Sequence, residues 1–438
     1  MVEPQGRRRD FIVQGLSVGY RIAVLLGGLL FAGPACSETL YDSAPPVVKA
    51  AVAPKAAASG TLATRTEIVA DRGLAAMLTP GSEAALQDAI AMYEEIVAGG
   101  GWPTVSGKNI TTGSTGESVA MLRRRLVAEN YLSFDSLNAA NPEIFDAEML
   151  AAAKAFQINH GVAPTGTVAE RTLAELNVSA ETRLETLREN LDRVLIYSQK
   201  LGNRYILANI PSAQLETVEN GQVYSRHNIV VGKLERPSPT LMSTVSDIVF
   251  NPYWKIPASI VERDIVPKYL EDPSYLDKMN IRVFDGVGGP EIEPDSVDWE
   301  STPPEQYFFR QEPGENNSLG TVKINFPNEH MVFMHDTPHR ETFASNARFE
   351  SSGCIRIDQV REVINWIMQG RDGYDDAQFE MITASLEPTE VKIADAPDVR
   401  FMYLTAWATE DGAVNFRPDV YGLDGTGFIL GQPEPGTN

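Results

Sequence analysis

The spacing of apolar residues changes once along this chain of 438 residues, and this change constrains the fold more than any other feature. Up to about residue 200, apolar residues recur every three or four positions, as at Leu86, Ile90 and Tyr93, which indicates amphipathic helices. From about residue 203, segments such as RYILANIP and QVYSRHNIVVG alternate or are rich in β-branched residues, which is typical of strands. The sequence therefore predicts an α+β multidomain chain, helical first and then rich in strands.

The N-terminus has the layout of an export signal. Arg7, Arg8 and Arg9 precede an apolar run at 22–32, and the small-residue segment GPACSE follows it. The run is about half the roughly 20 residues that span a bilayer, so a cleaved signal peptide is favoured over a membrane tether, which stays the alternative. The segment RRDFIV resembles a twin-arginine signal, and Sec export is the other route. We therefore expect an exported, periplasmic protein.

These patterns predict the order of domains along the chain. A Pro, Ala and Ser-rich stretch follows the signal, and a polar, Gly and Pro-rich stretch interrupts the β-rich part. We expect a signal peptide at 1–36, a flexible tether at 37–60, a helical scaffold segment at 61–112, a helical module at 113–178 with Thr167 as a helix cap, a linker helix at 179–202, a β-rich domain at 203–385 with a mobile lid at about 267–320, and a C-terminal hairpin extension at 386–438.

Charge and cysteine content narrow the function. The net charge of −22 argues against nucleic acid as a partner, because phosphate binding needs clustered Lys and Arg. Of the two cysteines, Cys36 falls at the expected cleavage site, so Cys354 is expected to be the sole thiol of the folded protein. A lone thiol in an oxidising compartment favours a reactive role, and an inert buried thiol is the alternative.

The neighbours of Cys354 favour nucleophilic catalysis. His335 is expected at the end of a strand, 19 residues before Cys354, and could serve as the base that a thiol needs. Gly353 allows a sharp turn in which the Gly353 and Cys354 amides could face a developing oxyanion. Arg356 would share a strand face with Cys354 and could bind a substrate carboxylate. After this strand, a helix capped by Asp358 is expected.

A metal site is the competing interpretation. His335 and His339 are four residues apart, a spacing that suits metal ligands on a helix. Pro338 lies between them and disfavours a helix, and the segment has no HExxH arrangement. The sequence therefore predicts a site without a metal.

Several motifs resemble those of a known family. The segments HDTP and SSGCIR are similar to the catalytic signature of YkuD-type L,D-transpeptidases, in particular the large periplasmic branch, to which NPYWKIP and RQEPGENNSLGTVKINFPN are also similar. In the 113–178 module, the AFQ…G…TG…T spacing resembles a peptidoglycan-binding module. The resemblance implies that Cys354 is the nucleophile and His335 the base, with the Asp336 backbone carbonyl steadying the imidazole. Ser352 stands where the wider family has histidine, and Arg356 where many relatives have asparagine.

The resemblance also implies a reaction. Cys354 would form a thioester with a peptidoglycan stem peptide, and a second stem's amine would resolve it into a 3-3 cross-link. Water or a lipoprotein amine are alternative acceptors, giving an L,D-carboxypeptidase or a lipoprotein-attaching enzyme, and a non-catalytic wall-binding protein is a remote alternative. Expected partners are stem peptides, the sacculus and carbapenem-type β-lactams as covalent inhibitors, with no cofactor. Arg356, Ser352, Trp254 and Tyr307 are the expected substrate contacts.

Overall fold

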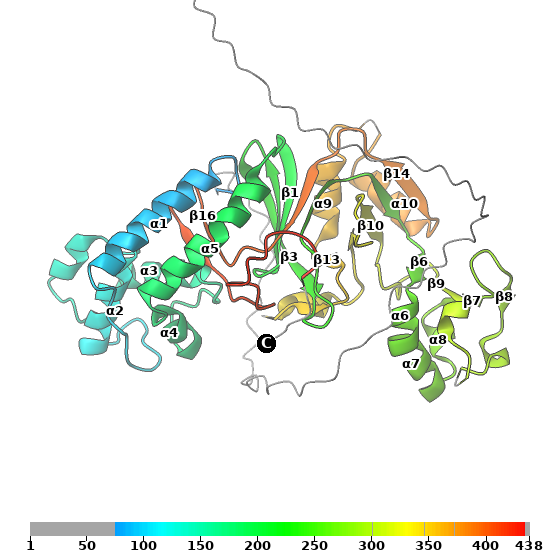
Figure 1. Ribbon diagram of the computed structural model, residues 1–438, viewed down its shortest axis with the longest axis horizontal. Helices are drawn as coiled ribbons and strands as arrows, with labels where there is room; N and C mark the ends of the chain where they lie inside the picture. The colour runs from blue at the N-terminus through cyan, green and yellow to red at the C-terminus, as the bar shows by residue number, and fades with distance from the viewer. Residues whose placement is uncertain (1–74, 300, 346, 372, 434–438) are drawn as a thin grey trace, which may run out of the picture. The chain divides into compact units, whose positions relative to one another are not determined.

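The computed structural model describes residues 75–433 except 300, 346 and 372. The expected signal peptide and tether lie outside the described residues. Among the residues that are described, no helix combines the length and apolar character needed to cross a membrane. The architecture is α+β, as the sequence predicts, with helices first and a large sheet after them (Figure 1).

The helices of the first part form two groups. The first group is the pair of long helices α1 and α5, which pack on the same hydrophobic cluster (Figure 1). The second group surrounds a separate small core that includes Phe145 and Phe156. The bounds are α1 Ser82–Ala98, α2 Glu117–Ala128, the 3-10 helix η1 Phe134–Asn138, α3 Ala147–Asn159, α4 Glu170–Leu176 and α5 Ala180–Ser198.

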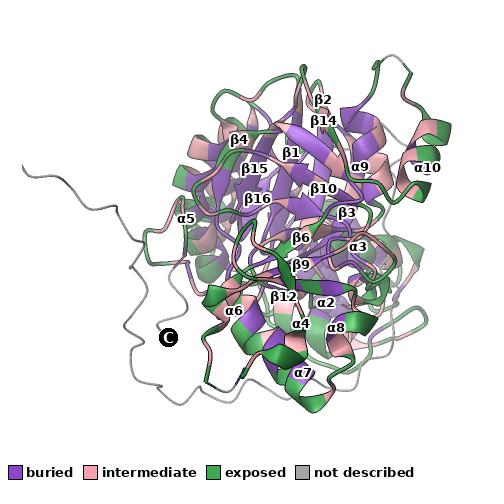
Figure 2. Cartoon of the chain, turned by 90° about the vertical axis from the view of Figure 1, so that its right-hand side faces the viewer, coloured by how far each residue is buried: buried purple, intermediate pink, exposed green. Residues whose placement is uncertain are grey.

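A mixed sheet of 11 strands forms the centre of the fold, in the order β14-β5-β10-β11-β13-β3-β2-β1-β15-β4, with β12 beside β3. Its strands are largely buried, whereas α7 and α10 expose much of their surface (Figure 2). The strands are β1 Arg204–Asn209, β2 Gln214–Glu219, β3 Gln222–Gly232, β4 Leu241–Thr244, β5 Asp247–Phe250, β10 Val322–Asn325, β11 Met334–His335, β12 Phe349–Ser351, β13 Ile355–Ile357, β14 Thr389–Lys392 and β15 Asp398–Met402. The helices after β13 are α9 Val360–Ile367 and α10 Asp376–Ala384.

The segment expected to be a lid is a folded subdomain. A second sheet in the order β6-β9-β7-β8 and short helices enclose a core of their own that includes Val261, Trp299 and Phe309. Its elements are β6 Trp254–Ile256, α6 Ala258–Ile260, a π turn at Val261–Ile265, α7 Val266–Glu271, α8 Tyr275–Lys278, β7 Ile281–Phe284, β8 Glu291–Ile292, η3 Pro294–Ser296, η4 Pro304–Gln306 and β9 Phe308–Gln311. It therefore begins earlier than the expected 267, and its core consists of aliphatic and aromatic residues spread along the segment.

The C-terminal part also differs from the expected hairpin extension. The hairpin of β16 Ala406–Ala408 and β17 Val414–Phe416 is present, with its turn at the EDG sequence. Strand β15, however, pairs with β1 in parallel and belongs to the main sheet. This long-range pairing leaves no local pattern in the sequence, so the boundary expected at 385 does not mark the end of the sheet.

Two expected helix caps are wrong. Helix α9 begins after Gln359, which has a left-handed conformation, and Asp358 does not cap it. Helix α4 begins after Ala169, without a side-chain cap, so Thr167 does not cap it either. Instead, Thr167 accepts a hydrogen bond from Gln157 through its backbone oxygen.

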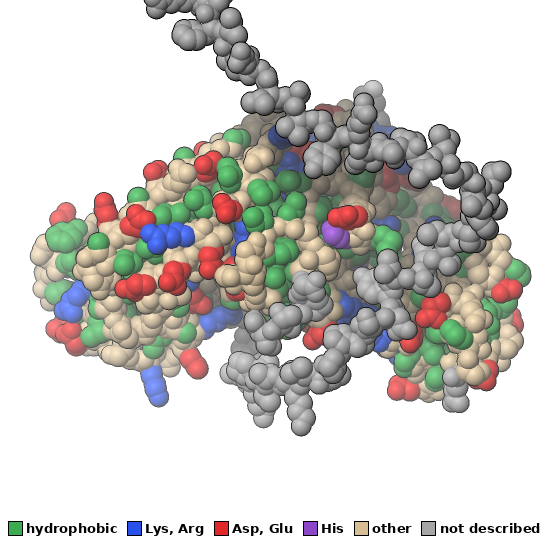
Figure 3. Space-filling view, in the orientation of Figure 1, with side chains coloured by type: hydrophobic (Ala, Val, Ile, Leu, Met, Phe, Trp, Pro, Cys, Tyr) green, Lys and Arg blue, Asp and Glu red, His purple; other side chains and the backbone are tan. Residues whose placement is uncertain are grey.

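Acidic side chains are scattered over the face of the molecule shown in Figure 3, over the helical part and over the second sheet, in keeping with the net charge of −22.

Candidate active site

Three neighbouring strands of the main sheet place basic residues side by side. Lys323 of β10 is paired with His335 of β11, and His335 is paired with Arg356 of β13. Directly paired residues project to the same face of a sheet, so Lys323, His335 and Arg356 form a row across three strands. The sheet register, rather than proximity in sequence, brings this row together.

Cys354 lies in the turn immediately before β13. The Ile355 amide donates to the Phe333 carbonyl at 3.1 Å, which aligns the turn with β11. Because side chains alternate along a strand, Cys354 shares its face with Arg356 and lies diagonal to His335. Cys354 is a free cysteine, and the residue as a whole is partly exposed. The register is therefore compatible with the expected pairing of a thiol and an imidazole, which stays a prediction.

The turn is held by hydrogen bonds from two serines. The Gly353 amide donates to Ser351 Oγ at 3.1 Å, and Ser351 Oγ donates to the Cys354 carbonyl at 2.6 Å. The Gly353 carbonyl accepts from Ser238 Oγ at 2.8 Å. Gly353 has φ of 110°, a conformation that a side chain would strain. The Gly353 amide, expected to face an oxyanion, is thus already bonded within the turn.

His335 is fixed in one tautomer. Its Nδ1 is bonded to the Asp336 backbone carbonyl, the contact that the family resemblance implied. A carbonyl oxygen only accepts, so Nδ1 carries the proton and Nε2 keeps its lone pair. The side chain is buried, with an exposed fraction of 5%. His335 is therefore chemically able to accept a proton through Nε2.

The Asp336 carboxylate accepts hydrogen bonds from residues around the site. It accepts hydrogen bonds from the amide and the hydroxyl of Thr321, at 2.9 and 2.8 Å, and from Arg340 at 2.9 Å. A Cβ on Gly320 would lie 2.5 Å from this carboxyl group, so only glycine fits there. Asp336 thus anchors the start of β10 to the end of β11, which keeps Lys323 and His335 in register.

Burial makes both members of the thiol and imidazole pair neutral. The pKa of His335 is lowered to about 3, mainly by burial and to a smaller extent by the nearby Arg356 and Lys323, whereas the Asp336 bond opposes the shift. Burial raises the pKa of Cys354 to about 11, against smaller lowering effects from a Phe333 backbone hydrogen bond and the two cations. At pH 7 the pair is therefore a thiol and a neutral imidazole.

Lys323 is a site residue that the sequence analysis missed. Its Nζ lies 4.1 Å from the centre of the Phe333 ring, and burial lowers its pKa. Arg356, on the other side of His335, has a buried Nε that finds no hydrogen-bond partner among the described residues. The signal available in the sequence was a lysine within the apolar strand TVKINF. Together the two cations can receive an anionic group next to the thiol.

Other predicted site residues lie elsewhere. Ser352 is exposed at the turn, and its contact with substrate stays a prediction. Trp254 and Tyr307 pack against the core of the second sheet, and the Tyr307 ring contacts Trp299 at 5.4 Å between centroids. Their expected substrate contacts also stay predictions.

His339 is separated from His335 by its environment. The His339 side chain is 62% exposed and lies 3.4 Å from Glu341, whereas His335 is buried. Within the described part of the chain, no group of three or more His, Cys, Asp or Glu side chains is arranged to hold a metal ion.

Comparison with known proteins identifies the domain that contains this site. Residues 203–383 match the sequence model of the YkuD family, described as the L,D-transpeptidase catalytic domain. These residues are therefore similar to YkuD-type L,D-transpeptidase domains. The match includes Cys354 and His335 and ends before β14.

The chain is also similar to a curated protein. A Haemophilus influenzae protein named "Putative L,D-transpeptidase" is 32% identical over 220 residues, which cover 50% of this chain. The chain spans 44% of the length of that relative. Among solved structures, an L,D-transpeptidase from Xylanimonas cellulosilytica aligns over 68% of this chain and 98% of its own, with 14% identity and a TM-score of 0.21. One from Stackebrandtia nassauensis aligns over 68% and 96%, with 13% identity and a TM-score of 0.26.

Proposed function

We propose that the protein is a cysteine-dependent L,D-transpeptidase that forms 3-3 cross-links between peptidoglycan stem peptides. The observation that carries the proposal is the Nδ1 bond of His335 to the Asp336 carbonyl, in a matched domain where Cys354 shares the same sheet face. This bond leaves Nε2 as the base for the thiol. The signal-like N-terminus supports a periplasmic location.

The first half-reaction acylates the enzyme. Sγ of Cys354 attacks the carbonyl carbon of the third stem residue while its proton moves to Nε2 of His335. The oxyanion is stabilised by the Cys354 amide, because the Gly353 amide is engaged by Ser351. The C–N bond to the terminal D-alanine then breaks, and the leaving amine takes the proton from Nε2. The product is a thioester on Cys354.

The second half-reaction releases the enzyme. A side-chain amine of another stem attacks the thioester and loses a proton to Nε2 of His335. The C–S bond breaks and the thiolate regains the proton. Lys323 and Arg356 flank His335 in the sheet and can hold the carboxylates of the donor stem. No cofactor takes part in these steps.

The nucleophile can be tested by acylation with a carbapenem. We expect one covalent adduct, located on Cys354 by mass spectrometry of peptides. Cys354→Ser should form none, because a hydroxyl is a far weaker nucleophile in a site built for a thiol. His339→Ala is the matched control and should react like the wild type, since that side chain is largely exposed. An adduct elsewhere, or none, would contradict the proposal.

The acceptor can be tested with purified sacculi or disaccharide tetrapeptides. We expect dimers joined through two third-position residues. Tripeptides alone would show that water is the acceptor and that the enzyme is an L,D-carboxypeptidase.

We further propose that the 113–178 module binds the sacculus. The support is its spacing of motif residues and its separate core. Replacing the module by a short linker is expected to reduce co-sedimentation with sacculi. The control is Arg417→Ala, which breaks the hydrogen bond to the Asn159 carbonyl at 2.8 Å but keeps the module. Equal sedimentation of the deletion variant and the wild type would contradict the assignment.

A further inference from the structure

The C-terminal segment at 403–432 contacts the loop that in turn contacts the residue before the nucleophile. The segment lies outside the matched domain, which ends at residue 383. Its Tyr421 is buried, with an exposed fraction of 3%, and its hydroxyl lies in the loop that follows β3. This loop, at 233–240, also contains Ser238, which contacts Gly353.

Tyr421 closes this loop through one oxygen atom. Its hydroxyl donates to the Gly232 carbonyl at 2.5 Å and accepts from the Ser238 amide at 3.2 Å. The loop is tight, because a Cβ on Gly232 would lie 2.3 Å from the Arg236 carbonyl oxygen. The two hydrogen bonds therefore set the position of Ser238 relative to the end of β3.

Ser238 contacts the peptide group that precedes the nucleophile, so its position affects that peptide. The Gly232 amide donates to Ser238 Oγ at 2.9 Å, so the hydroxyl proton is free to point at the Gly353 carbonyl, 2.8 Å from Oγ. The Gly353 carbonyl and the Cys354 amide belong to one planar trans peptide and point in opposite directions. Holding the carbonyl therefore aims the Cys354 N–H.

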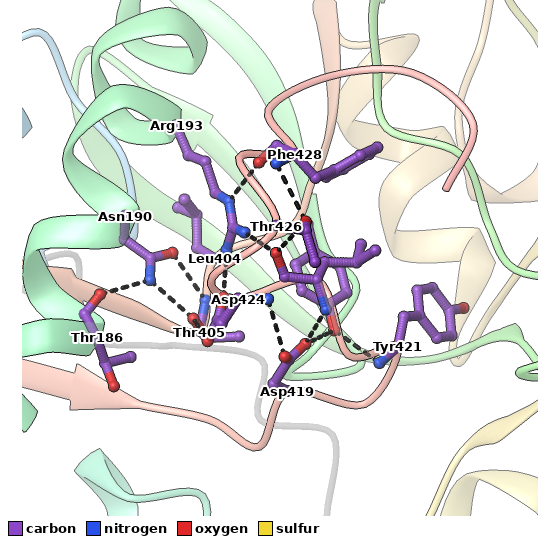
Figure 4. A network of polar contacts seen from close by, with 12 residues as sticks. Thr186, Asn190, Arg193, Leu404, Thr405, Asp419, Tyr421, Asp424, Thr426 and Phe428 are labelled. Carbon is purple, nitrogen blue, oxygen red and sulfur yellow. Dashed lines mark hydrogen bonds and ion pairs between the residues drawn. The ribbon is translucent and has the colours of Figure 1, made fainter. Parts of the chain in front are cut away.

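The segment itself is fastened to helix α5. Arg193 of α5 forms an ion pair with Asp424 at 2.6 Å and donates to the backbone carbonyls of Leu423 and Phe428, both at 2.9 Å (Figure 4). Asp419 accepts hydrogen bonds from the amides of Leu423 and Asp424, both at 2.9 Å. Tyr421 lies at the edge of this network (Figure 4).

A second tyrosine joins Tyr421 to the network. Tyr403 donates to Asp419 at 2.5 Å and accepts from the Tyr421 amide at 2.7 Å. The rings of Tyr403 and Tyr421 stack with centroids 5.6 Å apart. Tyr421 is therefore held through both its backbone amide and its ring, and this fixes where its hydroxyl lies relative to the loop.

We propose that Tyr421 and Ser238 are positioning residues for acylation: they hold the Gly353–Cys354 peptide so that the Cys354 amide faces the oxyanion. The inference rests on the proposed function, because it concerns the step in which Cys354 is acylated. It makes the C-terminal segment part of the catalytic unit, although the segment touches neither the thiol nor His335 in the contacts described above.

Two reactions of the same thiol separate this role from a general structural role. Acylation by a carbapenem needs the oxyanion donor, whereas alkylation by iodoacetamide needs only the thiol. Ser238→Ala is expected to slow acylation by about 10- to 100-fold, less than the roughly 10²- to 10³-fold loss seen when an oxyanion donor is removed, because the Cys354 amide stays in place. Tyr421→Phe is expected to slow acylation by about tenfold, because Ser238 is loosened but keeps its hydroxyl. Alkylation rates across pH should stay within about twofold of the wild type in both variants.

The matched control is Tyr205→Phe. Tyr205 is equally buried, and its hydroxyl donates to the Leu78 carbonyl at 3.0 Å, away from this loop. The Tyr205→Phe variant should be acylated at the wild-type rate even if its melting temperature falls. Ser238→Thr, which keeps the hydroxyl, should recover most of the rate lost in Ser238→Ala.

The outcomes distinguish the inference from the proposed function. Wild-type acylation rates in both Ser238→Ala and Tyr421→Phe would overturn the positioning role alone. Equal losses of acylation and alkylation would also overturn it, because the thiol itself would then be disturbed. If the wild type is not acylated at Cys354, the proposed function fails and the inference fails with it. If Tyr421→Phe does not fold, Ser238→Ala decides the question, because it leaves the C-terminal segment unchanged.

Discussion

Replacing His335 by alanine should change how acylation depends on pH as well as how fast it is. In the wild type, the pKa of His335 is lowered to about 3 and that of Cys354 is raised to about 11, so base and thiol both have the reactive protonation state between these values. Acylation should rise as pH increases through about 3, because the imidazolium loses its proton, and should then be level from about pH 5 to 9.

The size of the rate loss in His335→Ala follows from how little of the Cys354 thiol is ionised. Without a base, only the thiolate reacts, and a pKa of about 11 leaves roughly one part in 10⁴ ionised at pH 7. A positioned general base typically contributes about 10²- to 10⁴-fold, which overlaps with this figure. We therefore expect His335→Ala to lose about 10³- to 10⁴-fold at pH 7. Its rate should then rise about tenfold per pH unit up to about pH 10.

The assay is stopped-flow or mass-spectrometric acylation by a carbapenem from pH 5 to 10, with His339→Ala as the control. If the thiol had its ordinary pKa, the acylation rate of His335→Ala would stop rising near pH 8.5. Burial raises the pKa of Cys354, so we expect this plateau at a higher pH. A plateau near pH 8.5 would show that the thiol is not perturbed. A wild-type rate that rises tenfold per unit between pH 6 and 9 would refute the general-base role of His335.

Three further predictions concern other parts of the molecule. Lys323→Met should raise the KM for a donor stem with a free carboxylate by about tenfold, since a hydrogen bond to a charged group contributes about 1.5–3 kcal/mol. The KM for an amidated donor should be unchanged. Equal effects on the two donors in steady-state kinetics would contradict this prediction. Acid should destabilise the fold, because burial lowers the pKa of three histidines: that of His160, that of His227 to about 4 and that of His335 to about 3. Below pH 6.5 the unfolded chain therefore binds more protons than the folded chain does. The free energy of unfolding should fall by about 1.4 kcal/mol per pH unit for each histidine between pH 6.5 and its folded pKa; a constant melting midpoint from pH 7 to 5 would be inconsistent with this. Hydrogen exchange in the 254–311 subdomain should slow when an acylating β-lactam is bound, as expected for a lid, and identical protection with and without ligand would count against closure.

The sequence alone was sufficient to propose the chemistry of the site. A thiol, an imidazole and a glycine turn lie within one short segment, and a residue's type and local spacing do not depend on distant contacts. The α+β class followed in the same way, because the spacing of apolar residues reports which face of a helix or strand is buried. Cys354 and His335 could therefore be named before any coordinates were known.

Only the tertiary structure decided which residues support that chemistry. Lys323 joins the site because β10 pairs with β11, and Tyr421 reaches Ser238 because β15 brings the C-terminal segment back to β1. The subdomain at 254–311 encloses its own core, although its sequence is rich in polar and turn residues. The pKa values of Cys354 and His335 depend on burial, which is a property of the packed molecule. Pairing between distant strands and desolvation depend on contacts between residues far apart in sequence, so no local pattern predicts them.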